Sequence, residues 1–157
     1  MAVMIVILRR LQRLLAMLLR ATGHMVLSAA CPPRCSACDR PRRRAAVFCS
    51  PCAATLCSVE GARTLPAPCP VRIIAVGGYG GALAEALRRL KYQDRPDLAR
   101  PLGALAARAV RRHPRRPQLV VPVPLHPSRL AHRGYNQSAL LATVVASQLQ
   151  VPLLARA

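Results

Sequence analysis

Four cysteines have the spacing of a metal site. Cys35 and Cys38 form one C-x-x-C pair, Cys49 and Cys52 form a second, and ten residues separate the two pairs. Each pair makes a tight turn that directs two sulfurs to one point, so two pairs offer four thiolates to one tetrahedral Zn²⁺. A redox dithiol is the alternative chemistry for a single C-x-x-C. Two pairs at this spacing favour structural zinc, held by a four-cysteine zinc ribbon over residues 31–60.

The remaining cysteines have no such spacing. Cys31, Cys57 and Cys69 lie outside the two pairs, and we interpret them either as core residues or as remnants of a second metal site. Seven cysteines in a chain that is not exported indicate reduced thiols and metal rather than a disulfide framework.

A second candidate site lies in the stretch "VPVPLHPSRLAHRGYNQS", residues 121–138. Asn136 is a good helix N-cap, and a helix N-terminus offers free N–H groups and partial positive charge. Arg129 and Arg133 add charge near the same point, and Gly134 lets the backbone approach a ligand closely. The stretch therefore predicts a site for phosphate or pyrophosphate. The alternative is a surface loop whose arginines reflect composition alone.

Alternating strands and helices are expected to position this loop. Apolar runs bounded by glycine or proline indicate strands, and leucines at three- and four-residue spacing indicate helices. The order is strand, two helices, strand, helix, strand, which predicts an α/β fold with a mostly parallel sheet. Ligands bind beyond the carboxyl ends of strands in such sheets, where the loop lies. The expected strands are 71–78, 118–123 and one from 151, and the expected helices are 82–92, 98–112 and 136–150.

The first thirty residues suit an amphipathic helix. Five leucines between Leu8 and Leu19 recur at helical spacing, with arginines on the other side. The expected role is docking on the body of the protein, with attachment to an anionic membrane surface as the alternative. Arginines interrupt the apolar run too early for a membrane span or a signal peptide, so we expect a cytoplasmic protein.

The formal net charge is +19, from 24 basic and 5 acidic residues. An anionic partner, such as nucleic acid or a phosphate ester, is one reading of this charge. Compositional bias is the other reading, because Lys91 is the only lysine and Arg, Ala and Pro are all abundant.

The motifs together resemble the ComF family. The resemblance rests on the two C-x-x-C pairs, then "LRRLKY", then "VPVPLHPSRLAHRGYNQS", in that order, and it runs from about residue 35 to 154. These bacterial proteins are similar to type I phosphoribosyltransferases, and some are linked to DNA uptake in natural competence. The resemblance implies a partial phosphoribosyltransferase-like α/β domain over residues 70–157.

In that family the loop receives the pyrophosphate side of phosphoribosyl pyrophosphate. The resemblance implies that Lys91 and Tyr92 border the site. It implies that the pyrophosphate is held by Arg129, Arg133, Gly134, Asn136 and Gln137. Mg²⁺ would accompany phosphoribosyl pyrophosphate only where the site is complete.

The sequence also departs from the family pattern. The family continues with an Asp-Asp…Thr-Thr-Gly loop that holds the ribose 5′-phosphate, and no such string occurs in these 157 residues. We therefore expect a C-terminally truncated member that does not catalyse phosphoribosyl transfer alone, and no catalytic residue is assigned. The alternatives are a nucleic-acid-associated zinc module acting through its Arg42–Arg44 tip, and a non-functional remnant.

Overall fold

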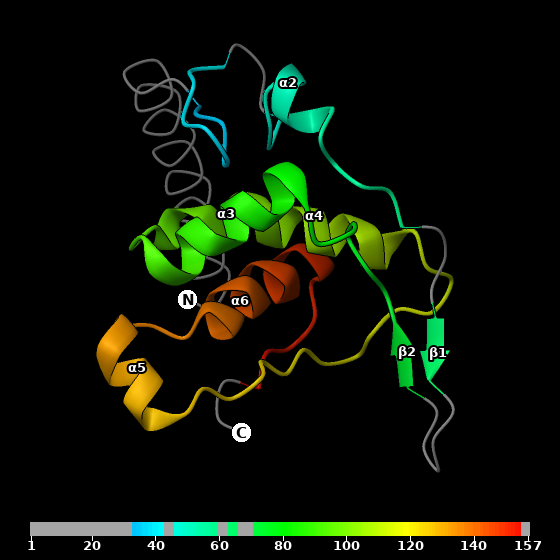
Figure 1. Ribbon diagram of the computed structural model, residues 1–157. Helices are drawn as coiled ribbons and strands as arrows, with labels where there is room; N and C mark the ends of the chain where they lie inside the picture. The colour runs from blue at the N-terminus through cyan, green and yellow to red at the C-terminus, as the bar shows by residue number, and fades with distance from the viewer. Residues whose placement is uncertain (1–32, 43–45, 60–62, 66–70, 155–157) are drawn as a thin grey trace, which may run out of the picture.

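A computed structural model describes residues 33–42, 46–59, 63–65 and 71–154 of the chain. The expected amphipathic helix of residues 1–30 lies outside these residues, as do Cys31 and Cys69. The central helices are flanked by the cysteine-bearing segment on one side and by a β-hairpin at the other end (Figure 1). The elements are α2 (Ser50–Ala53), β1 (Arg63–Leu65), β2 (Val71–Ile73), α3 (Gly81–Tyr92), the 3₁₀ turn η1 (Pro96–Leu98), α4 (Ala99–Arg111), α5 (Pro127–Arg133) and α6 (Gln137–Leu149).

The three expected helices are confirmed to within about a residue at each end. Leucines in α3 face inward, as predicted, because Leu83 and Leu90 are buried. Pro101 lies in the first turn of α4, where its missing N–H breaks no helical hydrogen bond. Asn136 caps α6, as its side-chain type predicts.

Among the described elements, α4 and α6 have the most extensive contact with each other. Gly103 lies at their crossing, where an added Cβ would come within 2.7 Å of the Val144 side chain and 3.2 Å of the Leu141 carbonyl oxygen. Small residues on the facing side of α6, Ala142 and Ala146, are buried there. The helices approach closely because Gly103 leaves room for the Val144 side chain and because Ala142 and Ala146 are small.

The cysteine segment shares its buried core with the helices. Cys35 and Phe48 belong to one cluster with Leu83 and Leu90 of α3 and Leu102 of α4. Since the apolar side of α3 is covered by this segment, the predicted ribbon is packed on the helical part rather than separated from it by a linker.

The expected buried strand at residues 71–78 is wrong. Only Val71–Ile73 forms a strand, and it pairs antiparallel with β1, so that Thr64 lies opposite Arg72. Val71 and Ile73 are 54% and 43% exposed, because no layer of described residues covers this hairpin.

The described residues do not form the mostly parallel sheet that we expected. Their only parallel pairing is a single bridge between Val120 and Leu153, made by two backbone hydrogen bonds of 3.0 Å. Proline lacks the N–H that a ladder needs, and Pro122, Pro124 and Pro152 flank the bridge. The neighbouring apolar side chains, including Val123 at 72%, are exposed.

Candidate functional site

The four paired cysteines meet at one point. The sulfurs of Cys35, Cys38, Cys49 and Cys52 all lie within 4.8 Å of one another, and those of Cys38 and Cys49 are 3.7 Å apart. Four sulfurs bound to a tetrahedral Zn²⁺ at about 2.3 Å lie about 3.8 Å from each other. The donor set therefore fits a Zn²⁺ ion, and the sulfur separations are within about 1 Å of this tetrahedral spacing.

Local hydrogen bonds favour a thiolate at one of these cysteines. Burial opposes ionisation of Cys35, but hydrogen bonds to its sulfur, led by the one from the backbone N–H of Cys49, lower its pKa to about 6. Burial raises the pKa of Cys52 to about 12, and the neighbouring thiols act in the same direction. Several thiolates at one point require a cation, because like charges raise one another's pKa.

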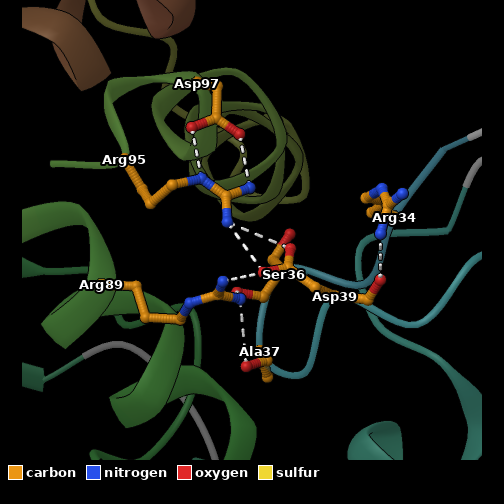
Figure 2. A network of polar contacts seen from close by, with 7 residues as sticks. All are labelled: Arg34, Ser36, Ala37, Asp39, Arg89, Arg95 and Asp97. Carbon is orange, nitrogen blue, oxygen red and sulfur yellow. Dashed lines mark hydrogen bonds and ion pairs between the residues drawn. The ribbon is translucent and has the colours of Figure 1, made fainter. Parts of the chain in front are cut away.

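Asp39 follows the first cysteine pair in the left-handed conformation that its position predicts, with φ of 57°. Its carboxylate accepts hydrogen bonds from the guanidinium groups of two arginines (Figure 2). One is Arg89 of α3, whose side chain is 10% exposed, and the other is Arg95, whose Nη1 lies 2.9 Å from Oδ2. These hydrogen bonds hold the pKa of Asp39 below its ordinary value.

The same two arginines make further contacts. Nη1 of Arg89 donates to the carbonyl oxygens of Ser36 and Ala37, at 3.2 and 3.1 Å. Arg95 also forms a two-bonded ion pair with Asp97, at 2.8 Å for each bond (Figure 2). The first cysteine turn is thus tied to the carboxyl end of α3 and the turn that follows. We refer to Asp39, Arg89, Arg95 and Asp97 as the carboxylate–arginine network.

The second cysteine pair is tied to the other end of α3. Oγ1 of Thr55 accepts a hydrogen bond of 2.9 Å from the backbone N–H of Ala82, which satisfies a free donor of the helix N-terminus. Gly81 has φ of 49°, and a Cβ there would lie 2.1 Å from the Thr55 carbonyl oxygen. Glycine is required at this close approach. Cys57, just beyond, is exposed and is not part of the sulfur cluster.

A cleft of about 1000 Å³ lies between the end of α3 and α5. Lys91 and Tyr92 line it from α3, and Arg129 and Arg133 line it from α5, followed by Gly134. Five of the seven residues predicted for the anion site therefore line a single cleft. The sequence analysis did not identify the five other lining residues as part of the site, namely Asp94, Ser128, Ala131, His132 and Tyr135.

The predicted basic loop contains a short helix, α5. The Nδ1 atom of His126 accepts a hydrogen bond of 3.3 Å from the backbone N–H of Ser128 and caps the helix, with Pro127 in its first turn. Gly134 ends it in the left-handed conformation, with φ of 77° and no atom within 4 Å of a Cβ. Gly134 is thus explained by helix termination. The His-Pro-Ser sequence was the available signal for this helix.

Asn136 and Gln137 are not among the residues that line the cleft. Oδ1 of Asn136 accepts from the backbone N–H groups of Ser138 and Ala139, at 2.9 and 3.3 Å, so it caps α6. Oε1 of Gln137 accepts a hydrogen bond from Arg133. Gln137 therefore acts on the cleft through Arg133, and Asn136 fixes the start of α6.

Two aromatic residues fix the geometry of the cleft. The guanidinium of Arg133 lies 5.2 Å from the centre of the Tyr92 ring, within the range of a cation–π interaction. The hydroxyl of Tyr135 donates to the carbonyl oxygen of Leu90 and joins the loop to α3. Burial and the nearby charge of Asp94 raise the pKa of Tyr135, so its hydroxyl stays protonated as a donor.

The described part of the arginine-rich tip makes local contacts. Nη2 of Arg42 donates to the carbonyl oxygen of Arg34 at 2.7 Å, and Arg40 is exposed. Arg43 and Arg44 lie outside the described residues. In the part of the chain that the structure describes, no helix is long and apolar enough to cross a membrane.

Comparisons with known proteins found relatives for this chain. It is 34% identical over 116 residues to DNA utilization protein YhgH of Escherichia coli K12, covering 68% of this chain and 51% of that protein. It is 32% identical over 123 residues to the protein of the same name in Salmonella typhimurium, covering 73% of this chain and 54% of the relative. The chain thus spans about half the length of these curated relatives.

A third relative carries a competence name. Competence protein F of Haemophilus influenzae is 33% identical over 86 residues, covering 52% of this chain and 38% of that protein. No family model matches the chain. No solved structure matches it either. Together, the ordered motifs and these relatives show that the chain belongs to the ComF family.

Proposed function

We propose that the chain binds the pyrophosphate group of a phosphoribosyl pyrophosphate-like molecule in the cleft between α3 and α5. One observation carries the proposal: Lys91, Arg129 and Arg133 come from two separate helices and line the same cleft. Guanidinium and ammonium groups converging on one space are suited to a phosphorylated ligand.

The cleft residues have distinct roles in this proposal. Arg129 and Arg133 donate charge-assisted hydrogen bonds to phosphate oxygens, and Lys91 adds a positive charge from the opposite wall. Arg133 is held in place by the Tyr92 ring and by Gln137, so little conformational freedom is lost on binding. Asp94 is the one carboxylate that lines the cleft in the described chain, and we propose that it faces the Mg²⁺ ion that accompanies a pyrophosphate.

The zinc site has a structural role in our proposal. Zn²⁺ bound by the four cysteines fixes the two turns that hold both ends of α3, through Thr55 at its start and the carboxylate–arginine network near its end. The cysteine pairs belong to a unit of residues 31–60, and the cleft to a partial phosphoribosyltransferase-like domain of residues 70–157. The bridge between Val120 and Leu153 supports a parallel pairing of these two segments in that domain.

The proposal concerns binding of the pyrophosphate group. No Asp-Asp…Thr-Thr-Gly string, the family motif for the ribose 5′-phosphate, occurs in the sequence. We infer a role in DNA uptake or utilization from the names of the relatives, DNA utilization protein YhgH and Competence protein F. A zinc-dependent nucleic-acid-associated protein without enzymatic activity is the second candidate, favoured by the net charge of +19.

Calorimetric titration of the zinc-loaded chain with phosphoribosyl pyrophosphate and Mg²⁺ tests the proposal. The wild type should bind, and Arg129→Gln should weaken binding by about tenfold, the usual loss for one charge-assisted hydrogen bond. The matched control is Arg108→Gln on α4, which removes the same charge away from the cleft. Absence of heat in the wild type, or equal losses in both variants, would refute it.

A further inference from the structure

A second cleft, of about 430 Å³, lies between the β-hairpin and the segment that follows α4. Figure 1 shows this segment passing β1 and β2, at the end of the molecule away from α5. Arg72 lines the cleft from β2, and His113, Arg115 and Arg116 line it from the segment after α4. None of these residues belongs to the sites described above.

The second cleft gathers three guanidinium groups and a histidine ring. Nη1 of Arg72 lies 3.3 Å from Nδ1 and 3.4 Å from Nε2 of His113, which directs this arginine to the cleft wall. No carboxylate is among the described residues that line the cleft. Positive groups held near one another repel, and an anion bound between them offsets this electrostatic repulsion.

The described acidic residues all lie elsewhere. Asp39 and Asp97 belong to the carboxylate–arginine network, Glu85 pairs with Arg88 on α3, and Asp94 lines the first cleft. Among the described residues, Arg115 and Arg116 therefore have no carboxylate partner that would compete with a ligand. The charge of this cleft is available to an external anion.

The ligand must also match an apolar surface. Ile74, Val110 and Pro117 line the same cleft between the basic groups. A single nucleic-acid strand presents phosphates beside exposed sugars and bases, whereas a duplex keeps its bases stacked inside. We propose that this second cleft binds the phosphodiester backbone of single-stranded nucleic acid, with Arg72, Arg115 and Arg116 contacting phosphates.

Fluorescence anisotropy with a labelled oligothymidylate of about a dozen nucleotides tests this inference, since that length lies within the roughly 4–16 nucleotides that small single-strand sites cover. The variant with Arg72→Gln and Arg116→Gln should bind about tenfold more weakly at low salt. Its slope of log affinity against log salt should become shallower by about 1.4, since each phosphate contact contributes roughly 0.7 for a single strand. If that variant folds poorly, Arg115→Gln alone should lower the affinity for the oligothymidylate by about threefold.

The matched control carries Arg40→Gln and Arg100→Gln, which remove the same charge from two exposed positions outside the cleft. It should stay within about twofold of the wild type. Equal losses in both double variants would show a bulk-charge effect and overturn the inference.

Displacement of the oligomer by inorganic pyrophosphate would assign binding to the first cleft, and displacement by anionic phospholipid vesicles would assign the second cleft to headgroups. Either result would also overturn it. Failure here leaves pyrophosphate binding in the first cleft intact.

Discussion

Asp39, which directly follows the first cysteine pair, accepts a hydrogen bond from the guanidinium of Arg89, fifty residues further along the chain. Arg89 lies near the end of α3, two residues before Lys91 and three before Tyr92, both of which line the cleft. The contact therefore joins the candidate metal site to the wall of the candidate anion site through three residues of one helix.

Replacing Asp39 by Asn should destabilise the protein. Arg89 is 9% exposed as a residue and would lose its charged partner, while Arg95 would keep Asp97. We expect a loss of about 2 kcal/mol in the free energy of unfolding, the range for hydrogen bonds to charged groups. Urea denaturation of the zinc-loaded protein measures it. Glu85→Gln, which breaks an exposed pair with Arg88, is the control and should cost less than about 0.5 kcal/mol.

The contribution of Asp39 should depend on pH. Hydrogen bonds from Arg89 and Arg95 lower its pKa in the folded state, so its stabilisation is fully present above the unfolded pKa of about 3.9. It is lost as pH falls further, toward the lower folded pKa. The difference in stability between wild type and Asp39→Asn should thus shrink below about pH 4. A gap that widens on acidification would contradict the assignment.

The zinc content of the protein should depend on which cysteine is replaced. The protein should contain about one equivalent of zinc, and Cys49→Ser should abolish it, because three sulfurs leave the tetrahedron incomplete. Cys57→Ser should retain the metal, since Cys57 is exposed outside the cluster. Metal analysis after purification without chelator gives both values. Retention of full zinc by Cys49→Ser would count against the four-cysteine site.

Two glycines with positive φ should respond differently to alanine. At Gly81 a Cβ meets the carbonyl oxygen of Thr55 at 2.1 Å, so Gly81→Ala should cost more than about 2 kcal/mol. At Gly134 a Cβ meets open space, and Gly134→Ala should cost only the conformational penalty of about 1 kcal/mol. Thermal unfolding of the two variants compares them directly. Equal costs would show that the approach of Thr55 to α3 is not tight.

Asp94 should make the affinity of the first cleft for pyrophosphate depend on Mg²⁺. Without Mg²⁺ its carboxylate repels pyrophosphate, so Asp94→Asn should raise the affinity by several-fold. With Mg²⁺ the carboxylate assists the ion, and the same substitution should lower the affinity. Calorimetric titrations with and without Mg²⁺ measure the two effects. An effect of the same sign in both conditions would exclude Asp94 from a metal-binding role.

The helices were readable from the sequence, but the strands were not. Leucine spacing predicts α3, α4 and α6, and the Asn136 cap marks the start of α6, because these signals are local in the sequence. Pairing of Val120 needs a partner distant in sequence, and Pro122 and Pro124 interrupt the apolar run that suggested a longer strand. The short helix α5 was missed because histidine is an uncommon cap.

Part of the candidate site could also be predicted from the sequence, because its signals are local. Paired cysteine spacing predicts the sulfur cluster, and the family motif names the arginines of the cleft. Neither predicts that Asp94 and Tyr135 line that cleft, or that Asp39 pairs with Arg89 across fifty residues. Those relations depend on how α3 packs against both the cysteine turns and α5, and no local pattern encodes that packing.

The central claim is that the cleft between α3 and α5 receives a pyrophosphate group. Amide chemical shifts of the isotope-labelled, zinc-loaded protein during titration with phosphoribosyl pyrophosphate and Mg²⁺ test it most directly. We predict saturable shifts confined to Lys91–Asp94 and Arg129–Gly134, and absent from the second cleft around Arg72. Shifts that remain linear in ligand, or that centre on Arg72 and Arg116, would contradict the account.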